Sequence, residues 1–265
     1  MSTDTCMTVG SSSYMTSLFL VPSRAARALV PDAFFKVAEI FPGKSVLFVG
    51  AGEFRQTTIG PYEELYIGFY TENRERGPHS NLLRNVYELA TNQSRMFMWR
   101  NWLSSKVALR RMDRAGSEIF RLGTLDRIDG ESSVTLSMEH PSEGRVRLTV
   151  PRKSRYPGSD QSMERTHYGR LHGRPCRAQL KLHVESMCTS PREGELLLEG
   201  EVAGQLRDLR IPAKPLASVW IEEMKFTLHK PVSLETGAEA PSAVACAAVM
   251  PTAEELNAAH SQQSS

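Results

Sequence analysis

Hydrophobic and polar residues alternate along most of the chain. Alternation with a period of two is typical of β-strands that bury one face. A turn sequence at 141–144 separates two of these runs and predicts a hairpin. The apolar members of the early and central runs are Leu18 and Leu20; Val46 and Phe48; Leu65, Ile67 and Phe69; Val134, Leu136 and Met138; and Val146, Leu148 and Val150.

The alternation continues toward the end of the chain. Apolar residues at positions 180, 182 and 184, and again at 196 and 198, predict a second meander. A last strand is expected over 219–228, and its alternation slips at Glu222 and Glu223, which indicates a β-bulge. The stretch 152–175 is basic and rich in turn residues, so we expect an irregular surface excursion or a lid there.

Two segments have helical rather than strand periodicity. A short helix is expected over 23–29, because Ser23 can cap its first turn and Pro31 ends it. Between 81 and 106, the apolar positions 82, 83, 86, 89 and 90 have the spacing of an amphipathic helix. Many strands and few helices predict a mainly β (α+β) protein, a barrel or sandwich with a small helical insertion.

Length and composition favour a single globular domain. Apolar residues make up 40% of the 265 residues and charged residues 23%, which are ordinary values for a folded protein. Residues 1–13 are small and polar, and residues 237–265 are rich in Ala, Ser and Pro, so both segments are predicted to be flexible tails. The folded domain is therefore expected to span 14–236.

The charge balance and the motifs that are missing argue against several classes of function. The formal net charge is +2, from 32 basic and 30 acidic residues, so we expect neither nucleic acid nor membrane as a partner. The sequence has no signal peptide, and its four cysteines lack metal-ligand spacing, so we expect a cytoplasmic protein with reduced thiols. It also lacks the glycine motifs of nucleotide sites and the serine-hydrolase elbow. We therefore expect no cofactor and no metal, and we read His167 and His172 as part of a surface loop.

A pair of glutamates begins the strand in IGPYEELYIGF. Alternation places Glu64 on the same face as Tyr62 and Tyr66, and it places Glu63 on the face of Leu65. One of the two glutamates must therefore point inward. A carboxyl group at the mouth of a β pocket has a raised pKa and can serve as a general acid or base. The alternative is a solvated Glu-Glu pair at the start of a strand.

The segment FMWRNWLSSKVALRRM contains a second candidate group. Two tryptophans flank Arg100, and Lys106 is one of only eight lysines, against twenty-four arginines. A lysine in an apolar or cationic setting has a lowered pKa and can form a Schiff base with a carbonyl compound. Arg100 could lower that pKa or bind a substrate carboxylate. The alternative is a basic strand with one surface lysine.

Four segments, taken in order, resemble the acetoacetate decarboxylase superfamily. They are VPSRAARALVP, IGPYEEL, RAQLKLHV and WIEEMKFTLHKPVSL, and together they cover most of 18–234. The resemblance implies a β cone or double barrel, an active-site acid at Glu64 and assembly into homo-oligomers. In the run that resembles the family's catalytic lysine motif, Arg100 matches and Lys106 is the candidate lysine. Asn101 replaces a glutamate of that motif, and its proline and second lysine are missing.

Three functions remain open on the sequence alone. The first is a carbon-carbon lyase that acts on a keto acid or a polyketide-like small molecule. In it, Lys106 forms a Schiff base with the substrate, Glu64 handles the proton and Arg100 orients the carboxylate. The second is a lysine-independent cyclase, isomerase or dehydratase of secondary metabolism that uses Glu64 with Tyr62 or Tyr66. The third is a protein that binds a small molecule without catalysis. In each case we expect an apolar pocket larger than acetoacetate requires, lined by Phe48, Phe69, Phe97, Trp99 and Trp102.

Overall fold

The computed structural model describes residues 5–30, 34–72, 82–91, 95–114, 119–153, 156–157 and 160–235. It is mainly β, as predicted. Its strands are β1 (Thr5–Pro22), β2 (Glu39–Phe41), β3 (Lys44–Thr57), β4 (Tyr62–Thr71), β5 (Arg95–Leu103), β6 (Phe120–Leu122), β7 (Thr124–Asp129), β8 (Ser133–His140), β9 (Gly144–Pro151), β10 (Tyr156–Pro157), β11 (Gln161–Leu171), β12 (Arg174–Pro191), β13 (Glu195–Glu199), β14 (Ala217–His229) and β15 (Val232–Ser233). Its helices are α1 (Ser23–Leu29), α2 (Leu82–Ala90), α3 (Lys106–Arg114) and α4 (Glu201–Gln205), and η2 (Arg207–Leu209) is a short 3-10 helix.

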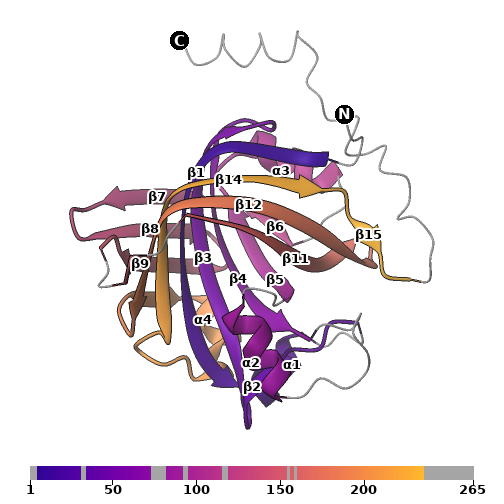
Figure 1. The fold of residues 1–265 in the computed structure, drawn as a ribbon, viewed down its shortest axis with the longest axis vertical. Coiled ribbons are helices and arrows are strands. Elements are labelled where there is room, and N and C mark those ends of the chain that lie inside the picture. Colours follow the sequence, from indigo (N-terminus) through magenta and orange to yellow (C-terminus); the bar gives the residue numbers. More distant parts are fainter. Residues whose placement is uncertain are drawn as a thin grey trace.

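Seven strands of the large sheet pair into a closed ring (Figure 1). The order is β1, β14, β12, β11, β5, β4 and β3, and β3 pairs back with β1. All pairings in the ring are antiparallel except that of β5 with β11, which is parallel over three residue pairs. Because successive side chains point to opposite faces of a strand, the ring has an inner face and an outer face with different residues.

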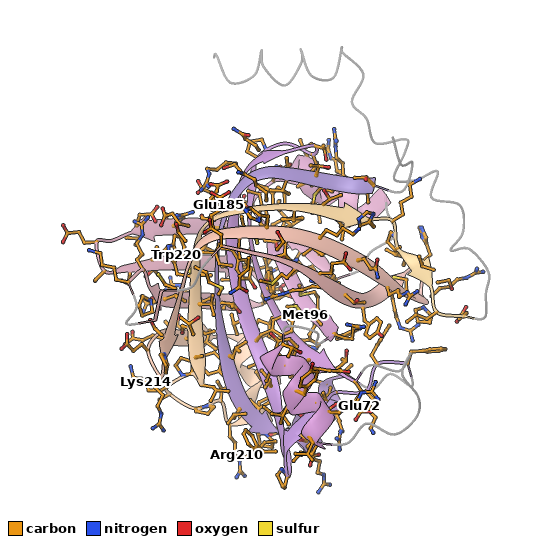
Figure 2. All side chains as sticks on the ribbon, in the orientation of Figure 1. Glu72, Met96, Glu185, Arg210, Lys214 and Trp220 are labelled. Carbon is orange, nitrogen blue, oxygen red and sulfur yellow. The ribbon has the colours of Figure 1, made fainter. Side chains whose placement is uncertain are left out.

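The outer face of the ring is covered by a second, smaller sheet. The order of this sheet is β13, β9, β8 and β7, and it extends to the left in Figure 1. Apolar residues of β8 and β9, such as Leu136 and Leu148, share one hydrophobic core with Leu65 and Ile67 from the ring. Trp220, labelled in Figure 2, belongs to the same core and lies where β14 meets the small sheet.

A second hydrophobic core lies on the inner face. It includes residues from β1, β3, β4, β5, β12 and β14, and Ala108 of α3 belongs to it as well. Two cores on opposite faces of one sheet explain why strands such as β3 are apolar on both sides. Val46, Leu47, Phe48 and Val49 are consecutive and all buried.

The predicted helices and the predicted bulge are largely confirmed. Helix α1 covers 23–29 and α2 covers 82–90, and the pairing of β14 with β1 gains an extra residue between Ile221 and Met224. The cap assigned to Ser23 is wrong: the N-cap position is Pro22, and no side chain caps the helix. Instead, the Ser45 hydroxyl donates to the buried Ser23 hydroxyl at 2.9 Å.

Two predictions about irregular segments need correction. The N-terminal tail predicted over 1–13 is wrong from residue 5 onward, because β1 begins at Thr5 and buries Met7 and Val9. The excursion predicted over 152–175 is wrong where it covers the whole of β11, a regular strand. The predicted C-terminal tail, 237–265, lies outside the described residues. Within the described part of the chain, no helix is long and apolar enough to cross a membrane.

Candidate active site

A cavity of about 230 Å³ lies inside the ring of strands. All seven strands of the ring contribute to its lining, together with β6 and α3. Most of the lining is apolar. The polar side chains that matter for chemistry and for ligand binding are few: Tyr14, Tyr62, Glu64, Tyr66, Asn101, Arg165, His167 and Arg170.

Glu64 points into this cavity because of its position in β4. Tyr62, Glu64 and Tyr66 alternate with outward-facing residues and all line the cavity, as the sequence pattern predicted. Burial raises the pKa of Glu64 from 4.5 to about 7, and a hydrogen bond with the Asn101 side chain opposes part of the shift. At neutral pH, Glu64 can therefore both accept and donate a proton.

Two tyrosine hydroxyls meet beside Glu64. The Tyr66 hydroxyl donates a hydrogen bond to the Tyr14 hydroxyl, and the two rings stack with centroids 6.2 Å apart. Burial raises the pKa of both tyrosines, so both stay protonated at neutral pH. Gly50 on β3 makes room for the Tyr66 ring, since a Cβ atom at this position would lie 2.5 Å from Tyr66 Cζ.

A bulge in β5 decides which residues of the Trp-rich segment reach the cavity. Met98 points inward, and simple alternation would place Arg100 next on the same face. The register shifts at this point: Gly68 of β4 faces Met98, but Ile67 faces Arg100. The inserted residue reverses the alternation, so Asn101 lines the cavity and Arg100 does not.

The side chains that the bulge turns outward contact residues on the outer face of the ring. Arg100 Nε lies 3.6 Å from Glu143 Oε1, and its guanidinium lies over the Trp99 ring at 4.6 Å from the centroid. The Trp102 indole nitrogen donates to Glu143 as well, and Trp102 is fully buried in the outer core. The prediction that Arg100, Trp99 and Trp102 face the cavity is therefore corrected.

Three phenylalanines predicted to line the cavity also lie elsewhere. Phe97 lies on the outer face, where its ring is 5.1 Å from that of Phe35. Phe69 belongs to the outer core. Phe48 is on the inner face but is fully buried behind Tyr66 and Tyr70, with ring centroids at 5.9 and 5.3 Å. Each is a structural residue of the sheet rather than part of the cavity wall.

Lys106 is the first residue of α3, and its side chain is exposed. Helix α3 covers one end of the cavity with Met112, and Ala108 is buried one turn earlier. Residues 108 and 112 share one face of a helix, whereas residue 106 lies on the opposite side. Lys106 is thus outside the cavity, and no lysine occurs among the described residues that line it.

The sequence analysis missed the cavity residues contributed by β11, and its reading of His167 as part of a surface loop is wrong. Arg165 and His167 both point inward, and Arg165 Nη1 lies 3.9 Å from Met96 Sδ; Met96 is labelled in Figure 2. Burial lowers the pKa of His167 to about 4, with the Arg165 charge as a second cause, so His167 is neutral at pH 7. Two inward positions of this strand carry Arg165 and His167, which interrupt the apolar alternation by which a strand is recognised. Among the described residues, no three His, Cys, Asp or Glu side chains form a group that could hold a metal.

No protein-family model and no curated protein matches this sequence. Solved structures do match its fold. An acetoacetate decarboxylase from Legionella pneumophila is 13% identical over 86% of this chain and 88% of its own, with a TM-score of 0.61. The enduracididine biosynthesis enzyme MppR in complex with pyruvate is 11% identical over 88% and 91%, with a TM-score of 0.60. An acetoacetate decarboxylase-like enzyme from Sphingomonas wittichii RW1 is 14% identical over 88% and 94%, with a TM-score of 0.57.

These likenesses define the fold of the protein. The closed ring, the small outer sheet and the interior cavity form an acetoacetate decarboxylase-like fold, so the fold predicted from the sequence resemblance is confirmed. Within that fold, this chain has a glutamate and a tyrosine pair in its cavity and an exposed lysine at position 106.

Proposed function

We propose that this protein is an enzyme that transfers a proton at a carbon atom next to a carbonyl group, without a lysine Schiff base. The observation that carries the proposal is Glu64, a carboxyl group inside an apolar cavity with its pKa raised to about 7. An acid or base is most effective when its pKa is near the working pH. Isomerases and dehydratases that act next to a carbonyl group, and some cyclases, begin with this kind of proton transfer.

In the proposed reaction, the Glu64 carboxylate removes a proton from the carbon next to the carbonyl group. The electron pair of that C–H bond forms the double bond of an enolate, and the negative charge moves to the carbonyl oxygen. The Glu64 carboxylic acid then returns the proton. Return to a different carbon gives an isomer, and transfer to a leaving hydroxyl group releases water. Neither outcome needs an oxidant or a reductant.

The tyrosine pair is suited to stabilise the enolate oxygen. Tyr14 accepts a hydrogen bond from Tyr66, which leaves the Tyr14 hydrogen free to be donated to a substrate oxygen. Both tyrosines are buried and are held by ring contacts, so they need little rearrangement during the reaction. Preorganised donors of this kind commonly contribute a factor of about 100 to 1,000 to the rate.

The positions of the other candidates favour this mechanism over Schiff-base chemistry. Lys106 is exposed and Arg100 is bound to Glu143 on the outer face, so neither is placed to contact a ligand that Glu64 contacts. The structure of MppR with pyruvate supports a small carbonyl compound as the kind of ligand that a cavity in this fold accepts.

The experiment is hydrogen exchange at carbon, followed by NMR in D2O. Two probes are used: phenylpyruvate, which is a keto acid, and phenylacetone, which is a neutral ketone. We expect the wild-type protein to accelerate exchange at the CH2 group of at least one probe above the buffer rate. Glu64→Gln should lose at least 100-fold of that acceleration. Glu63→Gln is the matched control, because Glu63 directly precedes Glu64 in the same strand and lies outside the cavity lining.

Lys106→Ala separates this mechanism from the Schiff-base mechanism. We expect the variant to keep the wild-type exchange rate, and borohydride added with phenylpyruvate should leave Lys106 unmodified. A trapped adduct on Lys106, together with loss of exchange in Lys106→Ala, would overturn the proposal. So would full activity in Glu64→Gln.

A further inference from the structure

The polar groups of the cavity follow a fixed order along the strands. In the pairing of β4 with β5, Tyr70 faces Met96 at one end and Glu64 faces Leu103 at the other. Arg165 lies at the Tyr70 end, because its Nη1 contacts the Met96 sulfur at 3.9 Å. Tyr70 and Glu64 are six positions apart in the same strand, which corresponds to roughly 20 Å between their backbones.

The tyrosine pair lies between the two charged groups, because Tyr66 stands between Glu64 and Tyr70 on the inner face of β4 and its hydroxyl meets that of Tyr14. Burial is the main cause that raises the pKa of Tyr14 and Tyr66; the Glu64 charge adds to the shift, and the Arg165 charge opposes it. Burial and Asn101 account for the shift of Glu64 itself. A ligand that contacts Arg165 and Glu64 together must therefore extend past the tyrosine pair.

The rest of the cavity wall is apolar and rich in methionine. The unbranched thioether side chain of methionine adapts its shape to the ligand that it contacts. Aromatic and aliphatic residues complete the wall, among them Phe54, Phe120 and Ile221. The methionines of the lining are Met7, Met96, Met98, Met112 and Met224, which come from β1, β5, α3 and β14.

We propose that the ligand of this cavity is an amphipathic carboxylate with an apolar tail. Its carboxylate binds the Arg165 guanidinium, and its tail is buried against the methionine-lined wall. The reactive carbonyl lies between the carboxylate and the tail, opposite Tyr14 and Glu64. This placement of the carbonyl rests on the proposed function, whereas the placement of the carboxylate and of the tail rests on the cavity alone. Arg170 also lines the cavity and adds a second positive charge, so the wall is more cationic than anionic.

The first experiment measures binding of straight-chain ligands by calorimetry. The ligands are carboxylates from butanoate to dodecanoate and the primary alcohols of the same lengths. Burial of each methylene should strengthen binding of the carboxylates about three- to fourfold until the cavity is full. At equal length, octanoate should bind the wild-type protein at least tenfold more tightly than octan-1-ol. Equal affinity of the two, or affinity independent of chain length, would overturn the inference.

A pair of arginine variants tests where the carboxylate binds. Arg165→Met replaces the guanidinium with an unbranched apolar side chain. We expect it to weaken octanoate binding at least tenfold and to leave octan-1-ol binding within about threefold. Arg174→Met is the matched control, because Arg174 is exposed at the start of β12 and does not line the cavity. Unchanged octanoate affinity in Arg165→Met would overturn the assignment to Arg165.

The two proposals can fail separately. Exchange of phenylacetone with no preference for octanoate over octan-1-ol would support the proton-transfer chemistry and refute the carboxylate ligand. Tight, chain-length-dependent binding of carboxylates with no exchange of either probe would refute the chemistry and support the ligand class.

Discussion

Replacing Glu64 by glutamine should change how the stability of the folded protein depends on pH. Burial raises the pKa of Glu64 from 4.5 to about 7, so the folded state binds this proton more tightly than the unfolded state does. The stabilisation that comes from the bound proton is fully present below pH 4.5. It is lost as the pH rises to 7, because the ionised carboxylate is then buried.

The size of this effect follows from the pKa shift. One pKa unit corresponds to about 1.4 kcal/mol, so a rise from 4.5 to about 7 corresponds to roughly 3 kcal/mol. The Glu64 side chain is partly exposed to the cavity, and water there screens some of this cost. Glutamine has nearly the same shape and carries no charge. We therefore expect Glu64→Gln to gain about 2 kcal/mol in unfolding free energy, relative to wild type, between pH 5 and pH 8.5.

Urea denaturation of both proteins at several pH values measures this difference. Glu164→Gln is the control, because Glu164 is an exposed residue that pairs with exposed Lys181 at 3.5 Å. Its unfolding free energy should stay within about 0.5 kcal/mol of wild type at every pH. A constant difference between Glu64→Gln and wild type from pH 5 to pH 8.5 would refute the reasoning. If Glu64→Gln instead lost stability relative to wild type as the pH rose, the folded state would be shown to stabilise the ionised form of Glu64.

Three further predictions concern the same site. The exchange rate of the wild-type protein should rise with pH, with a midpoint near 7, because the ionised form of Glu64 is the base; a flat profile would contradict this. Tyr14→Phe should slow exchange about 100-fold and, because the buried Tyr66 hydroxyl loses its acceptor, should lower Tm by roughly 2–8 °C; a wild-type exchange rate would remove Tyr14 from the mechanism. Gly50→Ala places a Cβ atom 2.5 Å from Tyr66 Cζ, so the Tyr66 ring must move by about 1 Å. The exchange rate should then fall about 100-fold, and Tm should fall by about 3–8 °C. Gly204→Ala would meet no heavy atom within 4 Å beyond its neighbouring residues and the backbone of α4, so it should leave the exchange rate unchanged and should raise Tm slightly if it changes it at all. Equal behaviour of the two variants would contradict the steric argument.

The inward direction of Glu64 could be predicted because β4 alternates without interruption from Tyr62 to Tyr66. The directions of Arg100 and Asn101 could not, because the bulge in β5 is defined by its pairing with β4. Within β5 itself, nothing in the residue types marks where the alternation reverses.

The missed strand β11 has a related cause. Its inward positions carry Arg165 and His167, so a search for alternating apolar residues finds no strand there. The polar inward residues become explicable only once the cavity that they face is known. Tyr14 was overlooked for a simpler reason, since it follows a polar segment that was read as a tail but forms the first half of β1.

The sequence by itself determined the mainly β class, the outline of the fold and the face on which Glu64 lies, because period-two alternation is a local property of a strand. The tertiary structure decided which faces enclose the cavity, how the β5 bulge divides the Trp-rich segment, and that Lys106 lies on the exposed side of α3. These features depend on pairings between strands far apart in the chain. The order of residues within one segment does not encode such pairings.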